Sequence, residues 1–254
     1  MSPLSTKHVS VDVIIINLPI SYRLCTVCIL GASEYWRNEN TPLHFASMCG
    51  NLGVIEILLK NPKSEYWKCQ NGLSPLHFAA KSGHLEAYKL IAKYSDDKNP
   101  KSDSSEYMGL EHAKELEFTT PLHLAAEYGH LTICQFIVAN VGDKNPKCWL
   151  KCTPFHSAAM QGHLEICRLL IENSTDKNPV GAAAYTPLHW AAERGHLAVC
   201  QLIIENIGHY TNTDDLNKSP FELAAENGHE SVCRFLKDVV SRSGRYKGQY
   251  ILTY

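Results

Sequence analysis

The chain has 254 residues, of which 44% are hydrophobic and 20% are charged, and its formal net charge is −2. This length suffices for one large domain or two small ones. The near-neutral charge argues against a general nucleic-acid binder, which would carry a basic excess on one face, and it is too mild for an acidic disordered chain.

Residues 1–32 contain an apolar stretch, at 13–30, that does not match the rest of the chain. A membrane-spanning helix needs about 20 predominantly apolar residues, and Pro19 and Arg23 interrupt this stretch. The basic region that opens a signal peptide is nearly absent. We therefore expect no membrane association and predict that 22–30 form a degenerate helical cap. A membrane segment and a truncated earlier repeat are the alternatives.

The rest of the chain is organised by one recurring motif. The hexapeptide T-P-L-H-F-A opens at Thr41, and close variants follow at spacings of 33, 46, 33, 33 and 33 residues. Such self-similarity at a fixed period is typical of solenoid proteins, in which each repeat contacts its neighbours. The six copies begin at Thr41, Ser74, Thr120, Thr153, Thr186 and Ser219.

The T-P-L-H-x-A signature at this period resembles the ankyrin repeat, and the resemblance covers residues 33–238. It implies an all-α solenoid of stacked helix–turn–helix units with extended, β-hairpin-like fingers between them. It also implies that the repeat histidines bond across finger and helix backbones. We predict six repeats, which start near residues 36, 69, 115, 148, 181 and 214.

The residues themselves indicate the same helices. A Thr or Ser hydroxyl before Pro is typical of a helix start, since the hydroxyl caps free N–H groups and Pro suits the first helical position. A glycine such as Gly162 ends the first helix in a left-handed turn. A second apolar helix follows, as at 164–171, and we expect it to end near an asparagine in the left-handed conformation. These asparagines are Asn140, Asn173 and Asn206.

Three departures from the period are informative. The second interval is thirteen residues too long, which predicts an insertion at about 101–113 in a finger connection. In the last copy Glu222 replaces the histidine, as suits a terminal repeat with no following neighbour. Residues 239–254 form a basic, tyrosine-rich tail, which we expect to be a mobile terminus.

Histidine and cysteine are abundant, with thirteen and ten copies. Ten histidines occupy two repeat positions, and four cysteines recur at 33-residue intervals. Equivalent residues of packed helices lie about 8–10 Å apart, too far for a disulfide or a shared zinc ion. We therefore predict structural roles, with cysteine as a small buried hydrophobe. The four cysteines are Cys134, Cys167, Cys200 and Cys233.

The remaining cysteines give only weak signals. Cys25 and Cys28 have metal-like spacing without a second pair, and Cys148 and Cys152 flank two apolar residues of a finger. Ten cysteines without a pairing scheme suggest a reducing compartment. Neither a GxSxG motif nor a Walker loop is present, so we expect no enzymatic activity, no metal and no cofactor.

By the same resemblance, a partner binds the concave surface of finger tips and first-helix faces. Exposed aromatic and arginine side chains there are typical anchors, and recurring carboxylates such as Glu226 indicate a solvated stripe. We expect Trp190, by contrast, to face the neighbouring helices. The predicted partner-binding residues, in repeats three to five, are Tyr128, Trp149, Leu150, Tyr185, Arg194, Glu127 and Glu193.

The leading interpretation is a non-catalytic protein–protein interaction scaffold or adaptor, monomeric on its own, located in the cytoplasm or the nucleus. We expect a protein partner and no nucleic acid. The second interpretation is a recognition or regulatory arm of a larger or associated enzyme complex. The third is a metal- or redox-sensing protein.

Overall fold

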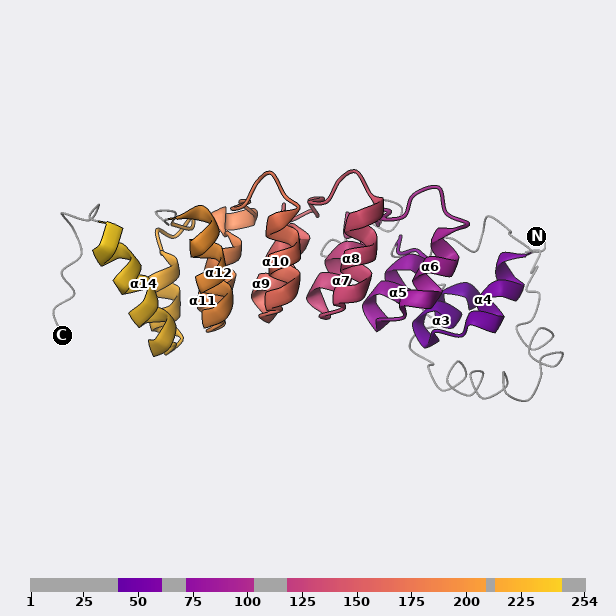
Figure 1. Cartoon of the computed structure of the whole chain (residues 1–254), viewed down its shortest axis with the longest axis horizontal. Helices are drawn as coiled ribbons and strands as arrows, with labels where there is room; N and C mark the ends of the chain where they lie inside the picture. Colours follow the sequence, from indigo (N-terminus) through magenta and orange to yellow (C-terminus); the bar gives the residue numbers. More distant parts are fainter. Residues whose placement is uncertain (1–40, 61–71, 103–117, 209–212, 244–254) are drawn as a thin grey trace, which may run out of the picture.

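The computed structural model describes residues 41–60, 72–102, 118–208 and 213–243. Within these ranges the chain forms twelve α-helices and no β-strand. Successive helices form helix–turn–helix pairs, and the pairs stack side by side in a single row, with the first and last helices at its opposite ends (Figure 1). The predicted all-α solenoid is confirmed.

Each pair consists of a first helix and a second helix. The first helices, which begin at the proline of each motif, are α3 (Pro42–Cys49), α5 (Pro75–Ser82), α7 (Pro121–Glu127), α9 (Pro154–Gln161), α11 (Pro187–Glu193) and α13 (Pro220–Glu226). The second helices are α4 (Leu52–Leu59), α6 (Leu85–Ala92), α8 (Leu131–Asn140), α10 (Leu164–Glu172), α12 (Leu197–Ile207) and α14 (Glu230–Ser243). Neighbouring pairs contact first helix to first helix and second helix to second helix.

The motif histidine completes the cap of every described first helix except α13, where Glu222 takes its place. In α5 the backbone N–H of Ser74 donates to His77 Nδ1 at 3.0 Å. Because Nδ1 accepts this bond, Nε2 carries the proton, and it donates to the carbonyl of Thr119 in the next finger at 3.0 Å. His44, His123 and His156 make the same pair of bonds. The predicted links across finger and helix backbones are thus confirmed.

A second histidine links four of the pairs backwards along the row, namely His130, His163, His196 and His229. His196 precedes α12, and its Nε2 lies 3.1 Å from the carbonyl oxygen of Met160 in the preceding pair. The imidazole packs against Gly162, whose φ of +77° ends α9 in the predicted left-handed turn. The three central boundaries between pairs are therefore held by bonds that run in both directions.

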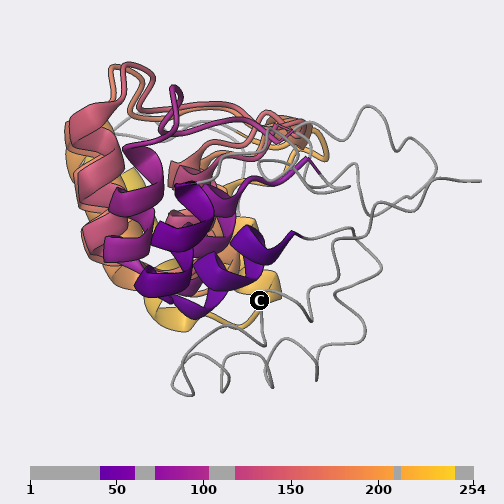
Figure 2. The same cartoon turned by 90° about the vertical axis from the view of Figure 1, so that its right-hand side faces the viewer.

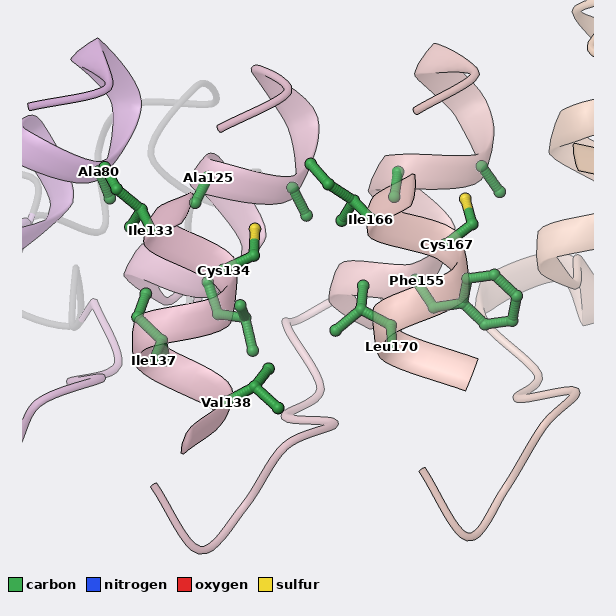
Figure 3. Packing of buried hydrophobic residues seen from close by; sticks show 14 of the residues in the cluster. Ala80, Ala125, Ile133, Cys134, Ile137, Val138, Phe155, Ile166, Cys167 and Leu170 are labelled. Atoms are coloured by element: carbon green, nitrogen blue, oxygen red, sulfur yellow. The ribbon is translucent and has the colours of Figure 1, made fainter. Parts of the chain in front are cut away.

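The core is a continuous apolar cluster along the row, and Figure 3 shows a portion of it. Ile133 and Ile137 of α8 are fully buried, and Ile166 and Leu170 occupy the same positions of α10 one period later. Burial of each such side chain contributes about 1.5–3 kcal/mol. Cys134 is also fully buried within this cluster, as expected for a small hydrophobe.

Cys167 and Cys200 repeat this burial, and burial raises the pKa of all three thiols to about 12. Cys233, at the same position of α14, is only half-buried. The predicted role as a buried hydrophobe is therefore confirmed for three of the four cysteines.

The prediction of left-handed asparagines after the second helices is wrong. Asn140 and Asn206 lie inside helices, and Asn173 has a φ of −101°. Each side-chain amide instead donates to the carbonyl four residues earlier, at 2.8–2.9 Å. The asparagine side chain thus satisfies a free carbonyl in the last turn of the helix, which a left-handed backbone turn would otherwise do. The left-handed non-glycine residues lie mainly in the fingers, at Phe118, Lys151, Ala183, Ala184 and Asn217.

The fingers are tight turns rather than stranded hairpins in the described residues. Cys148 N–H donates to the carbonyl of Cys152 at 2.9 Å, which closes the finger between α8 and α9. The next finger contains a short 3-10 helix, η5 (Ala182–Ala184). There Ala182 N–H donates to the carbonyl of Leu150 at 2.7 Å, so successive fingers are bonded to each other. Figure 2 shows the fingers projecting to one side of the helices.

The finger that contains the predicted insertion keeps the same base. Ser102 is buried, its N–H donates to the carbonyl of Thr119 at 2.8 Å, and its carbonyl accepts from Phe118 at 3.1 Å. Cys148 makes the same two bonds in the next finger, with Cys152 and Lys151. Most of the predicted insertion, 101–113, lies outside the described residues and stays a prediction. The bonds of Ser102 favour a start at residue 103.

Two deletions of equal length should show whether the insertion begins at residue 101 or at residue 103. Removing 103–115 restores the 33-residue period and keeps Ser102, so we expect a nearly unchanged melting temperature, because each doubling of loop length costs only about 0.6 kcal/mol. Removing 101–113 also restores the period but places Glu115 in the buried Ser102 position, which should cost about 2 kcal/mol or more. Thermal unfolding followed by circular dichroism compares the two; equal melting temperatures would argue against a buried finger base.

The last helix extends past the predicted end of the repeat domain. α14 continues to Ser243, and Val239 packs against the core. The first residues of the predicted tail, 239–243, therefore belong to this helix. The rest of the tail and the segment 1–32 lie outside the described residues. In the parts of the chain that the structure describes, no helix is long and apolar enough to cross a membrane.

Candidate protein-binding surface

The seven predicted residues come from two kinds of element. Glu127 and Glu193 end the first helices α7 and α11, and Tyr128 and Arg194 directly follow them. The other three lie in fingers: Trp149 and Leu150 before α9, and Tyr185 before α11. Trp149, Leu150 and Tyr128 are exposed by 54%, 46% and 45%. Arg194 is also exposed, while Glu127, Tyr185 and Glu193 are half-buried.

Trp149 and Leu150 lie on a turn whose backbone is fixed at several points. Cys148 and Cys152 close it, Lys151 N–H donates to the carbonyl of Cys148 at 2.9 Å, and the carbonyl of Leu150 accepts from the next finger. Two large apolar side chains are thus displayed to solvent on ordered backbone. Such anchors lose little entropy on binding, because the backbone that carries them is already ordered.

Tyr128 is paired with a residue of the preceding repeat. The Lys81 ammonium lies 5.2 Å from the centroid of the Tyr128 ring, a cation–π contact between α5 and the end of α7. Burial raises the pKa of the neighbouring Glu127 carboxyl, and the charge of Lys81 opposes this rise. Lys81 thus contributes positive charge beside two predicted residues, and the prediction of seven residues did not include it.

Tyr185 gathers aromatic and acidic groups from two repeats. Its ring centroid lies 4.9 Å from that of Trp190 and 5.4 Å from that of His189. Burial raises the pKa of Tyr185 to about 12, and the nearby Glu193 and Asp214 carboxylates add to the rise. The Tyr185 hydroxyl is therefore protonated at neutral pH and can donate a hydrogen bond to Glu193.

The expectation that Trp190 faces the neighbouring helices needs correction. Trp190 is only half-buried, and its ring packs on Tyr185 of the adjoining finger. The same repeat position is buried in Phe45 and Leu124 but half-buried in Ser157. That serine is the signal in the sequence that this position is not part of a strict core.

Of the three carboxylates predicted to form a solvated stripe, only Glu226 is exposed. Glu226 is exposed and forms a 2.7 Å ion pair with Lys218. Glu193 and Glu127 are half-buried, and Glu193 Oε2 is shielded from solvent without a hydrogen-bond partner among the described residues. Glu193 is therefore a carboxylate partly withdrawn from solvent beside Tyr185, rather than a freely exposed charge.

The described contacts bring together two groups of side chains: Lys81 with Tyr128, and Tyr185 with Trp190 and Glu193. That all seven predicted residues act on one partner stays a prediction. In the described residues, no group of three or more His, Cys, Asp or Glu side chains is placed to hold a metal ion.

A row of helix pairs linked by bonded fingers defines a repeat solenoid. The family model for ankyrin repeats matches the chain in three places, at residues 21–102, 107–180 and 175–243. The chain therefore belongs to the ankyrin repeat family, whose members generally act as protein–protein interaction modules and are generally not enzymes. The first match begins inside the segment 1–32. No curated protein matches the sequence.

Proposed function

We propose that this protein is a non-catalytic interaction scaffold or adaptor, which binds a partner protein on the concave surface of its fingers and first helices. The observation that carries the proposal is the exposure of Trp149 and Leu150 on a turn closed by backbone bonds. A tryptophan that is 54% exposed on ordered backbone has the features of a binding anchor, since tryptophan, tyrosine and arginine dominate binding hot spots.

The surroundings of this finger support a partner of mixed character. Tyr128 and Arg194 add exposed aromatic and cationic surface in the neighbouring repeats, while Glu127 and Glu193 supply half-buried carboxylates. Such an apolar centre with charged groups at its edge is the usual anatomy of a protein–protein interface. The net charge of −2 gives no general attraction to nucleic acid. We further propose that the protein is monomeric on its own and that it lies in the cytoplasm or nucleus. Ten cysteines without a pairing pattern support such a reducing compartment.

Affinity purification with the full chain, followed by mass spectrometry, identifies the partner, and calorimetry with the purified partner then tests the surface. Trp149→Ala should weaken binding by about 2 kcal/mol or more, which is roughly thirtyfold. Its melting temperature should stay close to that of the wild type, because a finger tip supports little of the helical core.

Leu216→Ala is the matched control. Leu216 is 75% exposed and occupies, in the last described finger, the position that Leu150 occupies two repeats earlier. Truncation there should change the affinity little if repeats three to five carry the binding energy. Unchanged binding by Trp149→Ala, or equal losses in both variants, would contradict the proposed surface.

A further inference from the structure

The finger that presents Trp149 and Leu150 differs from the others in its two closing residues. Cys148 N–H donates to the carbonyl of Cys152 at 2.9 Å, so the two cysteines face each other across the turn. The corresponding pairs elsewhere are Ser102 with Thr119, Gly181 with Tyr185, and Asp214 with Lys218. Among the described fingers, only this one therefore carries two thiols at its base.

The backbone geometry suits a bond between these sulfurs. The turn brings the two residues together, because Cys148 N–H donates to the Cys152 carbonyl and the Cys148 carbonyl accepts from the adjacent Lys151 N–H. The interaction between the two thiols places their sulfurs close to each other. Space is available on the side of the next finger, because Gly181 has no side chain; a Cβ there would lie 3.2 Å from Cys152 Sγ. Both cysteines are half-buried rather than enclosed in the core.

The chemistry of the pair is also asymmetric. A hydrogen bond between the two thiols lowers the pKa of Cys148 and raises that of Cys152. A thiolate is the attacking species in thiol–disulfide exchange, and a neighbouring thiol resolves the mixed disulfide. By contrast, burial raises the pKa of Cys134, Cys167 and Cys200 to about 12 and leaves those thiols inert.

We propose that Cys148 and Cys152 form a reversible disulfide across the base of this finger, by exchange with a small-molecule disulfide such as oxidised glutathione. The Cys148 thiolate attacks one sulfur of the oxidant, forms a mixed disulfide and releases one glutathione thiolate. Cys152 then attacks the Cys148 sulfur, and the second glutathione leaves with the proton of Cys152. The dithiol is oxidised by two electrons, and glutathione disulfide is reduced to two thiol equivalents.

The crosslink closes the turn that displays Trp149 and Leu150, so it ties the conformation of this binding surface to the redox state of its surroundings. Only that consequence rests on the proposed protein-binding function; formation of the disulfide is a property of the chain alone. In a reducing compartment such exchangeable disulfides are typical of redox sensing.

Peptide mapping of the full chain tests the disulfide without any partner. The protein is equilibrated in buffers of rising oxidised-to-reduced glutathione ratio, quenched with acid, alkylated and digested with trypsin. Cleavage after Lys147, Lys151 and Arg168 yields the peptides 148–151 and 152–168, which stay joined only if a disulfide links them. Under oxidising conditions, we expect the ratio of the joined species to the alkylated 148–151 peptide to rise by at least about tenfold. The joined species should disappear again when reduced glutathione is added.

Matched variants assign the crosslink. Peptide 152–168 also contains Cys167, so Cys167→Ala should retain the joined species, while Cys148→Ser and Cys152→Ser should abolish it. Circular dichroism of each variant confirms that it is folded. A joined species that survives Cys152→Ser would overturn the proposal. Separate peptides in the wild type at every ratio, or glutathione attached to Cys148 without closure, would also overturn it.

Discussion

The protein should lose most of its stability between about pH 6.5 and pH 4. His44, His77, His123 and His156 are buried, and burial lowers the pKa of each to about 4 from an ordinary value of 6.5. Between these values the unfolded chain binds protons that the folded chain does not, so the stability present above pH 6.5 falls as the pH falls. Each histidine contributes up to about 3 kcal/mol, and four together are comparable with the total stability of a domain, about 5–15 kcal/mol.

Protonation would also disturb the hydrogen bonds that each of these histidines makes in the cap. Nδ1 of His123 accepts from Thr120 N–H at 3.2 Å, and Nε2 donates to the carbonyl of Cys152 at 3.1 Å. A protonated ring can no longer accept at Nδ1, and it places a charge in the core. Chemical denaturation at several pH values should give a slope of about 1.4 kcal/mol per pH unit for each histidine that titrates.

His123→Gln tests this origin. Glutamine can accept the capping bond but does not titrate, so the variant should be less stable at pH 7.5 and should lose less stability on acidification. A wild-type stability that stays constant from pH 7 to pH 5 would show that these histidines do not control acid unfolding.

Gly162→Ala should be among the most destabilising single changes in the stack. Gly162 has a φ of +77°, and a Cβ there would lie 2.6 Å from His196 Nδ1. The left-handed conformation costs a non-glycine residue about 1–2 kcal/mol. The ring must also move, which disturbs the bond between His196 and the Met160 carbonyl. We expect a total loss of about 2–4 kcal/mol in the free energy of unfolding, measured by urea denaturation.

Gly228→Ala provides the matched control. Gly228 ends α13 with a φ of +75°, but a Cβ there would have no atom within 4 Å. This variant should therefore lose only the backbone contribution, about 1–2 kcal/mol. Equal losses for both glycines would mean that the contact with His196 yields in the variant without cost.

The repeat architecture could be predicted from the sequence because its signals are local and periodic. Threonine, proline and glycine act through their own backbone, so a cap such as Thr153 or a turn such as Gly162 is recognisable in any copy of the motif. The prediction of left-handed asparagines was wrong because an asparagine side chain can also form a local hydrogen bond. Asn173 donates to the carbonyl of Leu169 at 2.9 Å and does not adopt a left-handed conformation. Composition alone does not distinguish these two uses of asparagine.

The binding surface was less predictable, because contacts between repeats decide which side chains remain exposed. The pairing of Lys81 with Tyr128 joins residues of two different repeats, and the packing of Trp190 on Tyr185 depends on how a finger lies against a helix. No spacing within one motif encodes either contact. The seven predicted residues therefore remain a prediction about one surface, while the helices that position them are established.

Glu222, in the last described pair, gives the array a direction. Its carboxylate accepts from Ser219 N–H at 2.6 Å, as the histidines do with Nδ1, but an ionised carboxylate has no proton to offer the finger of a further repeat. The cap of the helix is thus kept, while the last described pair presents an acceptor where His44, His77, His123 and His156 each present a donor to the next finger. For anyone extending the solenoid by design, Glu222→His is the change that would make this end receptive to another repeat, and also to the finger of a second molecule.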